Sequence, residues 1–342
     1  MRQIDLYTAA GEPAGETIEF GQAVPEGRYH LVTELWVRNA LGEFLAVKMP
    51  ENAGDEGAAG WSILNDDVYR NESSFLCTLR LFREKAGVLM AADQGRKVHR
   101  IVEEDAPGAC SRLIREIWLY EYDEEGMAGC GMQMIVQAQG EDDAGLHFLP
   151  ASRILQMLQS GELDRRFSYF PEKIAGLGRV APARKGFRTV SFSRTEVSRA
   201  IRYPDINGQG RLFGGRLLEW IDECAGIASM RHAGQNVTTV SIEHLEFKKG
   251  AYANDTILLI ANVTHVGGSS IEVRVDTWLE DLKSGMRTVI NRAFLTEVCI
   301  DEKGRPTPVP YGLIMERESE MAKWEGAQRR INVRKQSRKE GF

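Results

Sequence analysis

The stretch PDINGQGRLFGGRLLEWID, residues 204–222, decides the fold of the second half of the chain. It leads from a loop crowded with glycines into a helix without proline, over residues 213–232. Apolar residues cover most of the circumference of this helix, and its narrow polar arc consists of Arg216, Glu219 and Glu223. A helix that is apolar nearly all round is a buried one, so we expect it at the centre of its domain.

Long strand patterns follow the helix. In IEVRVDTWL, residues 271–279, apolar residues alternate with charged ones, which is typical of a half-buried antiparallel strand. Strands of similar length are expected at 238–247, 257–266 and 288–300. One buried helix followed by four or five long strands predicts an antiparallel sheet that curves around the helix.

The loop and the start of the helix combine features that suit catalysis. Free N–H groups at a helix start attract anions, and glycines allow close backbone approach; these are Gly208, Gly210, Gly214 and Gly215. Asp222 lies away from the polar arc, where a carboxylate is either paired or functional because burying a lone charge is costly. Asn207 lies in the loop just before the helix, where an amide can orient a water or a carbonyl.

Together these features suit thioester hydrolysis. Attack on the carbonyl builds negative charge on its oxygen, and the loss of one fixed N–H donor costs roughly 3–4 kcal/mol. A carboxylate serves as general base for water or as nucleophile. Structural roles stay open at this point: Asp222 bonded to the backbone or to Arg231, glycines that only permit close packing, and Asn207 as a turn or cap residue.

The same stretch resembles the hotdog acyl-CoA thioesterases of the cytosolic acyl-CoA hydrolase type. Their entry motif is approximately P-x-D-x-N-x-x-G-x-x-F/H-G-G, before a central helix with an acidic residue. It is matched by Pro204, Asp205, Asn207, Gly210, Phe213, Gly214, Gly215 and Asp222. The resemblance continues through VSIEHLEFKKG (240–250), VTHVGGSSIEVRVDTWLED (263–281) and FLTEVCIDEKGRPTPVP (294–310). It implies a hotdog domain that hydrolyses acyl-CoA to free fatty acid and CoA.

The resemblance also implies roles for individual residues. Asp222 and Asn207 would form the catalytic pair, and the backbone of Gly214 and Gly215 would polarise the thioester carbonyl. A loop similar to the CoA-contacting segment of the family contains Gly267, Gly268, Ser269 and Ser270. Many relatives carry a basic residue at the position of Gly268, which weakens a phosphate contact in this loop. Candidate phosphate partners elsewhere are Lys248 and Lys249.

Relatives place the acyl-CoA site at a dimer interface. Because this chain contains one hotdog unit, at least a homodimer is implied, and hexamers built as trimers of dimers are common among the relatives. The expected ligand is acyl-CoA, and no cofactor is required because CoA is part of the substrate.

The first half, residues 3–170, resembles the Nudix hydrolases, which are α/β/α sandwiches. The resemblance rests on DLYTAAGEPAG (5–15), PEGRYHLVTELWVRNALGEFLAVK (25–48) and Trp61. The Nudix box, G-x5-E-x7-R-E-U-x-E-E-x-G-U with U bulky and apolar, is matched only in part over 66–88. The positions that fit are Glu72, Arg80, Phe82, Glu84, Gly87 and Val88.

Three box positions are lost. Asp66 replaces the first glycine, and Leu81 and Lys85 replace two glutamates. Box glutamates hold the Mg²⁺ ions that neutralise a pyrophosphate during hydrolysis. We therefore predict no Nudix hydrolysis and no Mg²⁺ in this domain, which either senses a nucleotide or CoA fragment or only packs in the oligomer. Residual metal binding stays open through Asp67, Glu103 and Glu104.

The predicted fold class is α+β, with two domains, since 342 residues exceed what one core usually serves. The Nudix-like domain is expected over 1–175 and the hotdog thioesterase domain over 191–312. A linker rich in proline, glycine and basic residues is expected over 176–190. Residues 313–342 are expected to form a solvated charged helix with a basic tail.

Composition limits the partners and the location. The net charge of -6 argues against nucleic-acid binding. Five cysteines without a CxxC pair and six histidines without metal spacing predict reduced thiols and no metal site. Without a membrane-length apolar run or a signal core, the expected location is the cytoplasm. The rival functions are an acyl-CoA or nucleotide-binding regulatory protein without turnover, and an active Nudix pyrophosphohydrolase.

Overall fold

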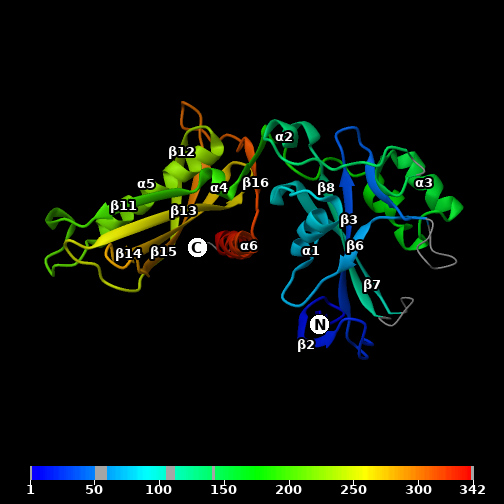
Figure 1. Ribbon diagram of the computed structural model, residues 1–342, viewed down its shortest axis with the longest axis horizontal. Coiled ribbons are helices and arrows are strands. Elements are labelled where there is room, and N and C mark those ends of the chain that lie inside the picture. The colour runs from blue at the N-terminus through cyan, green and yellow to red at the C-terminus, as the bar shows by residue number, and fades with distance from the viewer. Residues whose placement is uncertain (1, 51–59, 105–111, 141–142, 340–342) are drawn as a thin grey trace. The chain divides into compact units, whose positions relative to one another are not determined.

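The computed structural model describes residues 2–50, 60–104, 112–140 and 143–339. The chain divides into two compact units, residues 1–183 and 184–342. Each unit has its own sheet, and Figure 1 shows both with their labelled elements. Within the described ranges, no helix is both long and apolar enough to cross a membrane.

The first unit is built on a seven-stranded mixed sheet of order β5-β4-β3-β8-β7, in which β6 also pairs with β3 and β9 with β4. The central pair β3–β8 is parallel and the other pairs are antiparallel. The strands are β3 (His30–Arg38), β4 (Phe44–Lys48), β5 (Trp61–Ser62), β6 (Leu64–Asp67), β7 (Gly95–Glu103), β8 (Leu113–Glu121) and β9 (Gly145–Leu149). A separate hairpin joins β1 (Gln3–Tyr7) to β2 (Pro13–Glu19).

Helices lie on both faces of this sheet. Alternate residues of β3 point to opposite faces. Thr33 donates a hydrogen bond to the carbonyl of Ser74 in α1 (Ser74–Leu81), whereas Trp36 packs in the core that includes Ile154 of α3 (Ala151–Ser160). A π-helical turn, Phe82–Ala86, extends α1, and α2 is a short helix, Glu124–Gly129. The sequence predicted an α/β/α sandwich of the Nudix type for this half. The structure has a mixed sheet with helices here, and the Nudix type stays a prediction.

The second unit has the predicted buried helix and antiparallel sheet. The sheet order is β11-β13-β14-β15-β12, and every pair is antiparallel. The helix α5 (Gly214–Ala233) lies along it, and the residues that α5 buries include Leu217, Ile221 and Cys224. The strands are β11 (Thr195–Ala200), β12 (Val237–Phe247), β13 (Thr256–Val266), β14 (Ser270–Glu280) and β15 (Arg287–Cys299).

The linker expected over 176–190 is wrong at its C-terminal end. Residues from 184 onward belong to the second unit, where β10 (Gly186–Thr189) pairs in parallel with β16 (Tyr311–Ile314). The short helix α4 (Val190–Ser193) follows directly. Arg184, part of the basic run that suggested a linker, donates to the carbonyl oxygens of Val309 and Gly267 at 2.6 and 3.0 Å. Arg184 therefore ties the start of the second unit to two of its loops through hydrogen bonds.

The C-terminal helix differs from the solvated helix that charge spacing predicted. The helix α6 (Glu318–Lys339) buries Ala327 completely. Its Arg330 and Arg334 donate to Glu272 of β14 at 2.6 and 3.1 Å, and Glu272 is only 2% exposed. Glu272 alternates with the residues of β14 that face α5, so α6 covers the opposite face of the sheet. The last residues of the expected tail, 340–342, lie outside the described ranges.

Candidate active site

Asp222 lies near the middle of α5 and faces β12. Its Oδ1 accepts a hydrogen bond of 2.7 Å from the hydroxyl of Thr239. Arg231, the alternative partner considered from the sequence, instead donates to Thr195 and to the carbonyl of Arg194. Among the described residues, no lysine or arginine forms an ion pair with Asp222. Its hydrogen-bond partner in the described part of the chain is therefore a neutral hydroxyl.

Glu297 of β15 is a second carboxylate at this position, and the sequence analysis missed it. The hydroxyl of Thr239 lies 3.1 Å from both carboxylate oxygens of Glu297, which is 1% exposed. Burial raises the pKa of Glu297 to about 7, and the charge of Asp222 adds to the increase. Glu297 is spaced by two residues from Leu295 and Cys299, which are both fully buried. This spacing was visible in the sequence and predicts that the three side chains point to the same face of the strand.

Asn207 occupies the tight loop before α5. Its side-chain oxygen accepts from the backbone N–H groups of Gln209 and Arg211 at 2.9 and 3.2 Å. Gly210 has a φ of 73°, which favours glycine in this turn. The turn role that the sequence left open is therefore filled by the oxygen of Asn207. Its amide nitrogen has no partner among the described residues and remains available as a donor.

The glycine pair forms the N-terminus of α5. The helix begins at Gly214 after Phe213, and no side chain caps it. A Cβ on Gly215 would stand 2.6 Å from the ring of Phe213, so this position favours glycine. Asn207 and Gly214 line a cavity of about 390 Å³ together with Lys248 and Lys249. The structure thus brings four of the predicted residues to one place.

The loop predicted to contact CoA lies elsewhere on the unit. It joins β13 to β14, and the carbonyls of Gly268 and Ser269 accept from the N–H groups of Val309 and Cys299. The register pairs Ser270 with Val298, one residue from Glu297. Within one chain this loop, which starts at Gly267, is therefore close to the carboxylates of Asp222 and Glu297. It is separate from Lys248 and Lys249, which follow the other end of β12.

In the first unit, acidic residues from the segment that resembles a Nudix box are bound by an arginine of the same segment. Arg80 donates to Glu72 at 2.9 Å and to Asp66 at 2.7 Å. Leu81 is buried in the core. The other carboxylates that left metal binding open are also engaged: Asp67 with His30, Glu103 with Arg115 and Glu104 with Tyr29. No group of three metal-ligating side chains occurs among the residues that the structure describes.

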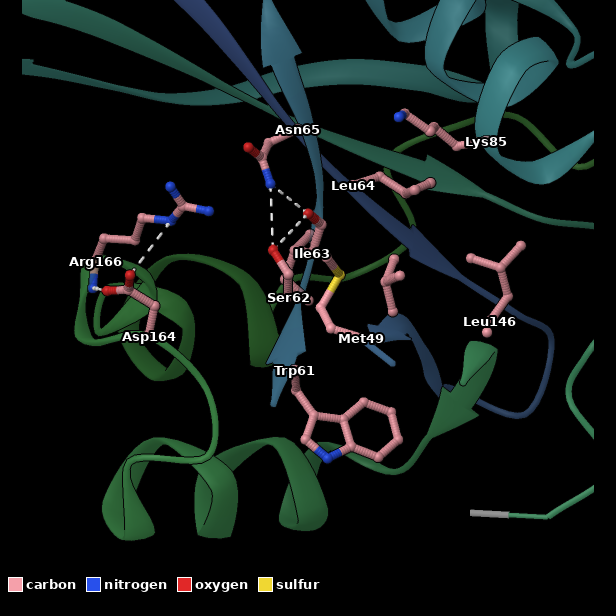
Figure 2. A pocket seen from close by; sticks show the side chains of 12 residues that line it. Met49, Trp61, Ser62, Ile63, Leu64, Asn65, Lys85, Leu146, Asp164 and Arg166 are labelled. Carbon is pink, nitrogen blue, oxygen red and sulfur yellow. Dashed lines mark hydrogen bonds and ion pairs between the residues drawn. The ribbon is translucent and has the colours of Figure 1, made fainter. Parts of the chain in front are cut away.

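A pocket of about 530 Å³ opens beside β5 and β6 of the first unit. Its apolar lining includes Met49, Trp61 and Leu146, whereas Arg166 and Lys85 stand on opposite sides of it, as Figure 2 shows. Arg166 has a weak ion pair of 4.0 Å with Asp164 of the same lining. Lys85 has no partner within the described part of the chain.

Part of the chain is similar to known proteins. The family model described as thioesterase superfamily matches residues 209–285. An uncharacterised acyl-CoA thioester hydrolase of Bacillus subtilis is 38% identical over 131 residues, covering 38% of this chain and 76% of that protein. The human cytosolic acyl coenzyme A thioester hydrolase is 28% identical over 141 residues, covering 40% of this chain and 36% of that protein.

Solved structures of acyl-CoA hydrolases are also similar to part of the chain. An acyl-CoA hydrolase from Staphylococcus aureus, solved with butyryl coenzyme A and coenzyme A, is 32% identical with a TM-score of 0.43. It covers 45% of this chain, and the alignment includes 93% of that structure. A hexameric acyl-CoA thioesterase is 39% identical with a TM-score of 0.42, over 44% of this chain and 96% of that structure.

Proposed function

The chain belongs to the thioesterase superfamily and is an acyl-CoA thioester hydrolase, and from this premise we propose that its second unit carries the active site around Asp222. The observation that carries this assignment is a carboxylate on a buried helix that has a hydroxyl partner and, in the described part of the chain, no paired cation. An unneutralised carboxylate is the form that a general base requires.

The proposed reaction uses water as the nucleophile. Asp222 takes a proton from water as the oxygen of that water bonds to the thioester carbonyl carbon. The backbone N–H groups of Gly214 and Gly215 stabilise the resulting oxyanion, and the amide nitrogen of Asn207 orients water or carbonyl. The carbon–sulfur bond then breaks, and CoA leaves as a thiolate that takes up a proton. The alternative, in which Asp222 attacks the carbonyl itself, uses the same residues.

Helix geometry supports a site shared between two chains. Asp222 lies eight residues after Gly214, which is about 12 Å along α5 at 1.5 Å per residue. One carbonyl cannot lie within contact of both positions on the same helix. We therefore propose at least a homodimer in which Asp222 of one chain works with Asn207 and the glycine pair of its partner. The edge strand β12, where Val240 is 52% exposed, is the proposed interface.

Two experiments test these proposals. Thiol release from acetyl-, hexanoyl- and palmitoyl-CoA should collapse in Asp222→Ala and persist in Glu223→Ala, which removes an adjacent exposed carboxylate bound to Arg199. Mixing Asp222→Ala with Asn207→Ala chains should restore about a quarter of wild-type activity if the site is shared, because half of the random dimers then hold one intact site of two. No recovery after verified subunit exchange would place the site within one chain.

For the first unit we propose a Nudix-like domain that has lost Nudix catalysis. The support is the occupation of Glu72 and Asp66 by Arg80, together with Leu81 and Lys85 at box positions that need glutamates. Purified protein with Mg²⁺ should hydrolyse neither ADP-ribose, CoA nor nucleoside diphosphates. Mg²⁺-dependent turnover of any of these that Glu72→Gln abolishes would contradict the proposal.

A binding role for this unit is favoured by its pocket. An apolar lining with Trp61 and two cations suits a ligand with a planar ring and phosphate groups, such as a nucleotide or CoA fragment. Calorimetry of the full chain with ADP and CoA should show binding that Lys85→Ala weakens and that Lys173→Ala, a surface lysine beside Glu172, leaves unchanged. The hexamer, the cytoplasmic location and the lack of a cofactor requirement stay predictions.

A further inference from the structure

The hydroxyl of Thr239 stands between two carboxylates. It lies 2.7 Å from Asp222 and 3.1 Å from both oxygens of Glu297. A hydroxyl has one hydrogen to donate, and an ionised carboxylate only accepts. Two ionised carboxylates therefore cannot both be satisfied by this hydroxyl. Both contacts are hydrogen bonds only when one carboxyl carries a proton and donates it to the oxygen of Thr239.

The surroundings decide which carboxyl holds that proton. Glu297 is 1% exposed, whereas Asp222 is partly exposed, so removal from water penalises a charge on Glu297 more strongly. The direct neighbour of Glu297 on β14 is the apolar Ile271, and its inward neighbours on β15 are Leu295 and Cys299. From α5 the charged group that acts on Glu297 is Asp222, and from the described side chains of β12 it is met by the hydroxyl of Thr239.

We propose that Glu297 is a positioning residue that carries a proton in the working enzyme and, through Thr239, keeps Asp222 as the single anion of the site. The order of hydrogen bonds is then fixed: Glu297 donates to Thr239, and Thr239 donates to Asp222. This inference rests on the proposed role of Asp222 and adds a residue to it.

Loss of the proton from Glu297 breaks this order. The hydroxyl hydrogen is then shared between two anions, and a second negative charge stands where the tetrahedral intermediate must develop its own. Because burial raises the pKa of Glu297 to about 7, the switch falls within the working pH range of a cytoplasmic enzyme. Activity should decline as the pH rises through this range.

The first test compares pH profiles of kcat/KM for wild type and Glu297→Gln. Glutamine keeps an N–H donor toward Thr239 and cannot ionise. Wild type should lose about fivefold or more between about pH 6 and pH 8.5, whereas Glu297→Gln should match it at the lower pH and stay level. The control Glu280→Gln, which removes a glutamate paired with Arg287 at the other end of β14, should follow wild type. Coincident profiles of wild type and Glu297→Gln would overturn the proposal.

The second test reads the proton directly and needs no turnover. Infrared difference spectra of wild type between the same two pH values should show loss of a protonated carboxyl band, and the Glu297→Gln spectrum should lack that band. A protonated carboxyl band that is lost in wild type and missing in Glu297→Gln would support the proposal even if no acyl-CoA tested were hydrolysed. In that case only the assigned function would be wrong. An unchanged wild-type spectrum would show that Glu297 does not lose a proton between these pH values, and the inferred switch would be wrong.

Discussion

Two clusters of acidic side chains, one in each unit, make an instructive comparison. In the first unit Asp66 and Glu72 are held by the guanidinium of Arg80 at 2.7 and 2.9 Å. In the second unit Asp222 and Glu297 share the hydroxyl of Thr239. Both clusters are largely shielded from water, and both join a helix to a neighbouring segment of its unit.

The difference is one of charge balance. Arg80 offers five N–H donors and a positive charge, so it can donate hydrogen bonds to both carboxylates and offset their negative charge. Thr239 offers a single hydrogen and no charge, so its carboxylates compete. A balanced cluster stabilises the fold and leaves no ligand for a metal, whereas an unbalanced one holds a base and a proton ready for chemistry.

The largest effect should come from removing the unbalanced charge. In Asp222→Asn the side chain keeps its shape but cannot accept a proton from water, so kcat should fall about 10³-fold, within the range that a general base contributes. Thiol release under saturating acyl-CoA measures the change. If Asp222→Asn kept more than about a tenth of the wild-type rate, Asp222 would not be the general base. The two acidic clusters would then not differ in catalytic role.

The second-largest effect should be a pH dependence of stability that comes from the cluster at Glu297. The folded-state pKa of Glu297, about 7, lies above its ordinary value. The contribution of Glu297 to the free energy of unfolding is therefore fully present below about pH 4.5 and is lost as the pH rises toward 7. Glu297→Gln escapes this loss and should gain about 2–3 kcal/mol over wild type between pH 5 and pH 8. Denaturant titrations at both pH values test it, and a constant difference would contradict the raised pKa.

Removing the cation of the balanced cluster should affect folding alone. Arg80→Met removes the cation that pairs with Asp66 and Glu72 and should lower the free energy of unfolding by about 2 kcal/mol, since both acids keep some access to water. Arg83→Met, an exposed arginine on the next turn, serves as the control. The kcat of the thioesterase should be unchanged in both variants. A kcat defect in Arg80→Met would mean that the first unit takes part in turnover.

The smallest effect should come from the bridging hydroxyl. Thr239→Val removes one charge-assisted hydrogen bond to Asp222 and should reduce kcat/KM about tenfold. Thr239→Ser restores the hydroxyl and should recover most of the activity. If valine and serine variants behaved alike, the hydroxyl would have no role in orienting Asp222.

Local patterns were sufficient for much of the architecture. The helix over 213–232 and the strands that follow it were predictable because periodicity is a property of consecutive residues. Leu81 and Lys85 were equally visible as departures from the Nudix box that this segment resembles. The prediction that α6 is solvated was wrong because charge spacing is also a local pattern. It does not reveal that Arg330 and Arg334 bind a buried carboxylate on a strand of the sheet.

The sequence by itself determined the central helix, the sheet around it and the candidate residues Asp222, Asn207, Gly214 and Gly215. Only the tertiary structure decided which acids are neutralised, because Thr239 meets Glu297 across 58 residues of chain and Arg80 meets Asp66 across 14. It also separated Lys248 and Lys249 from the loop at Gly267. Charge balance depends on distances between segments that the fold brings together, and no pattern along one segment contains those distances.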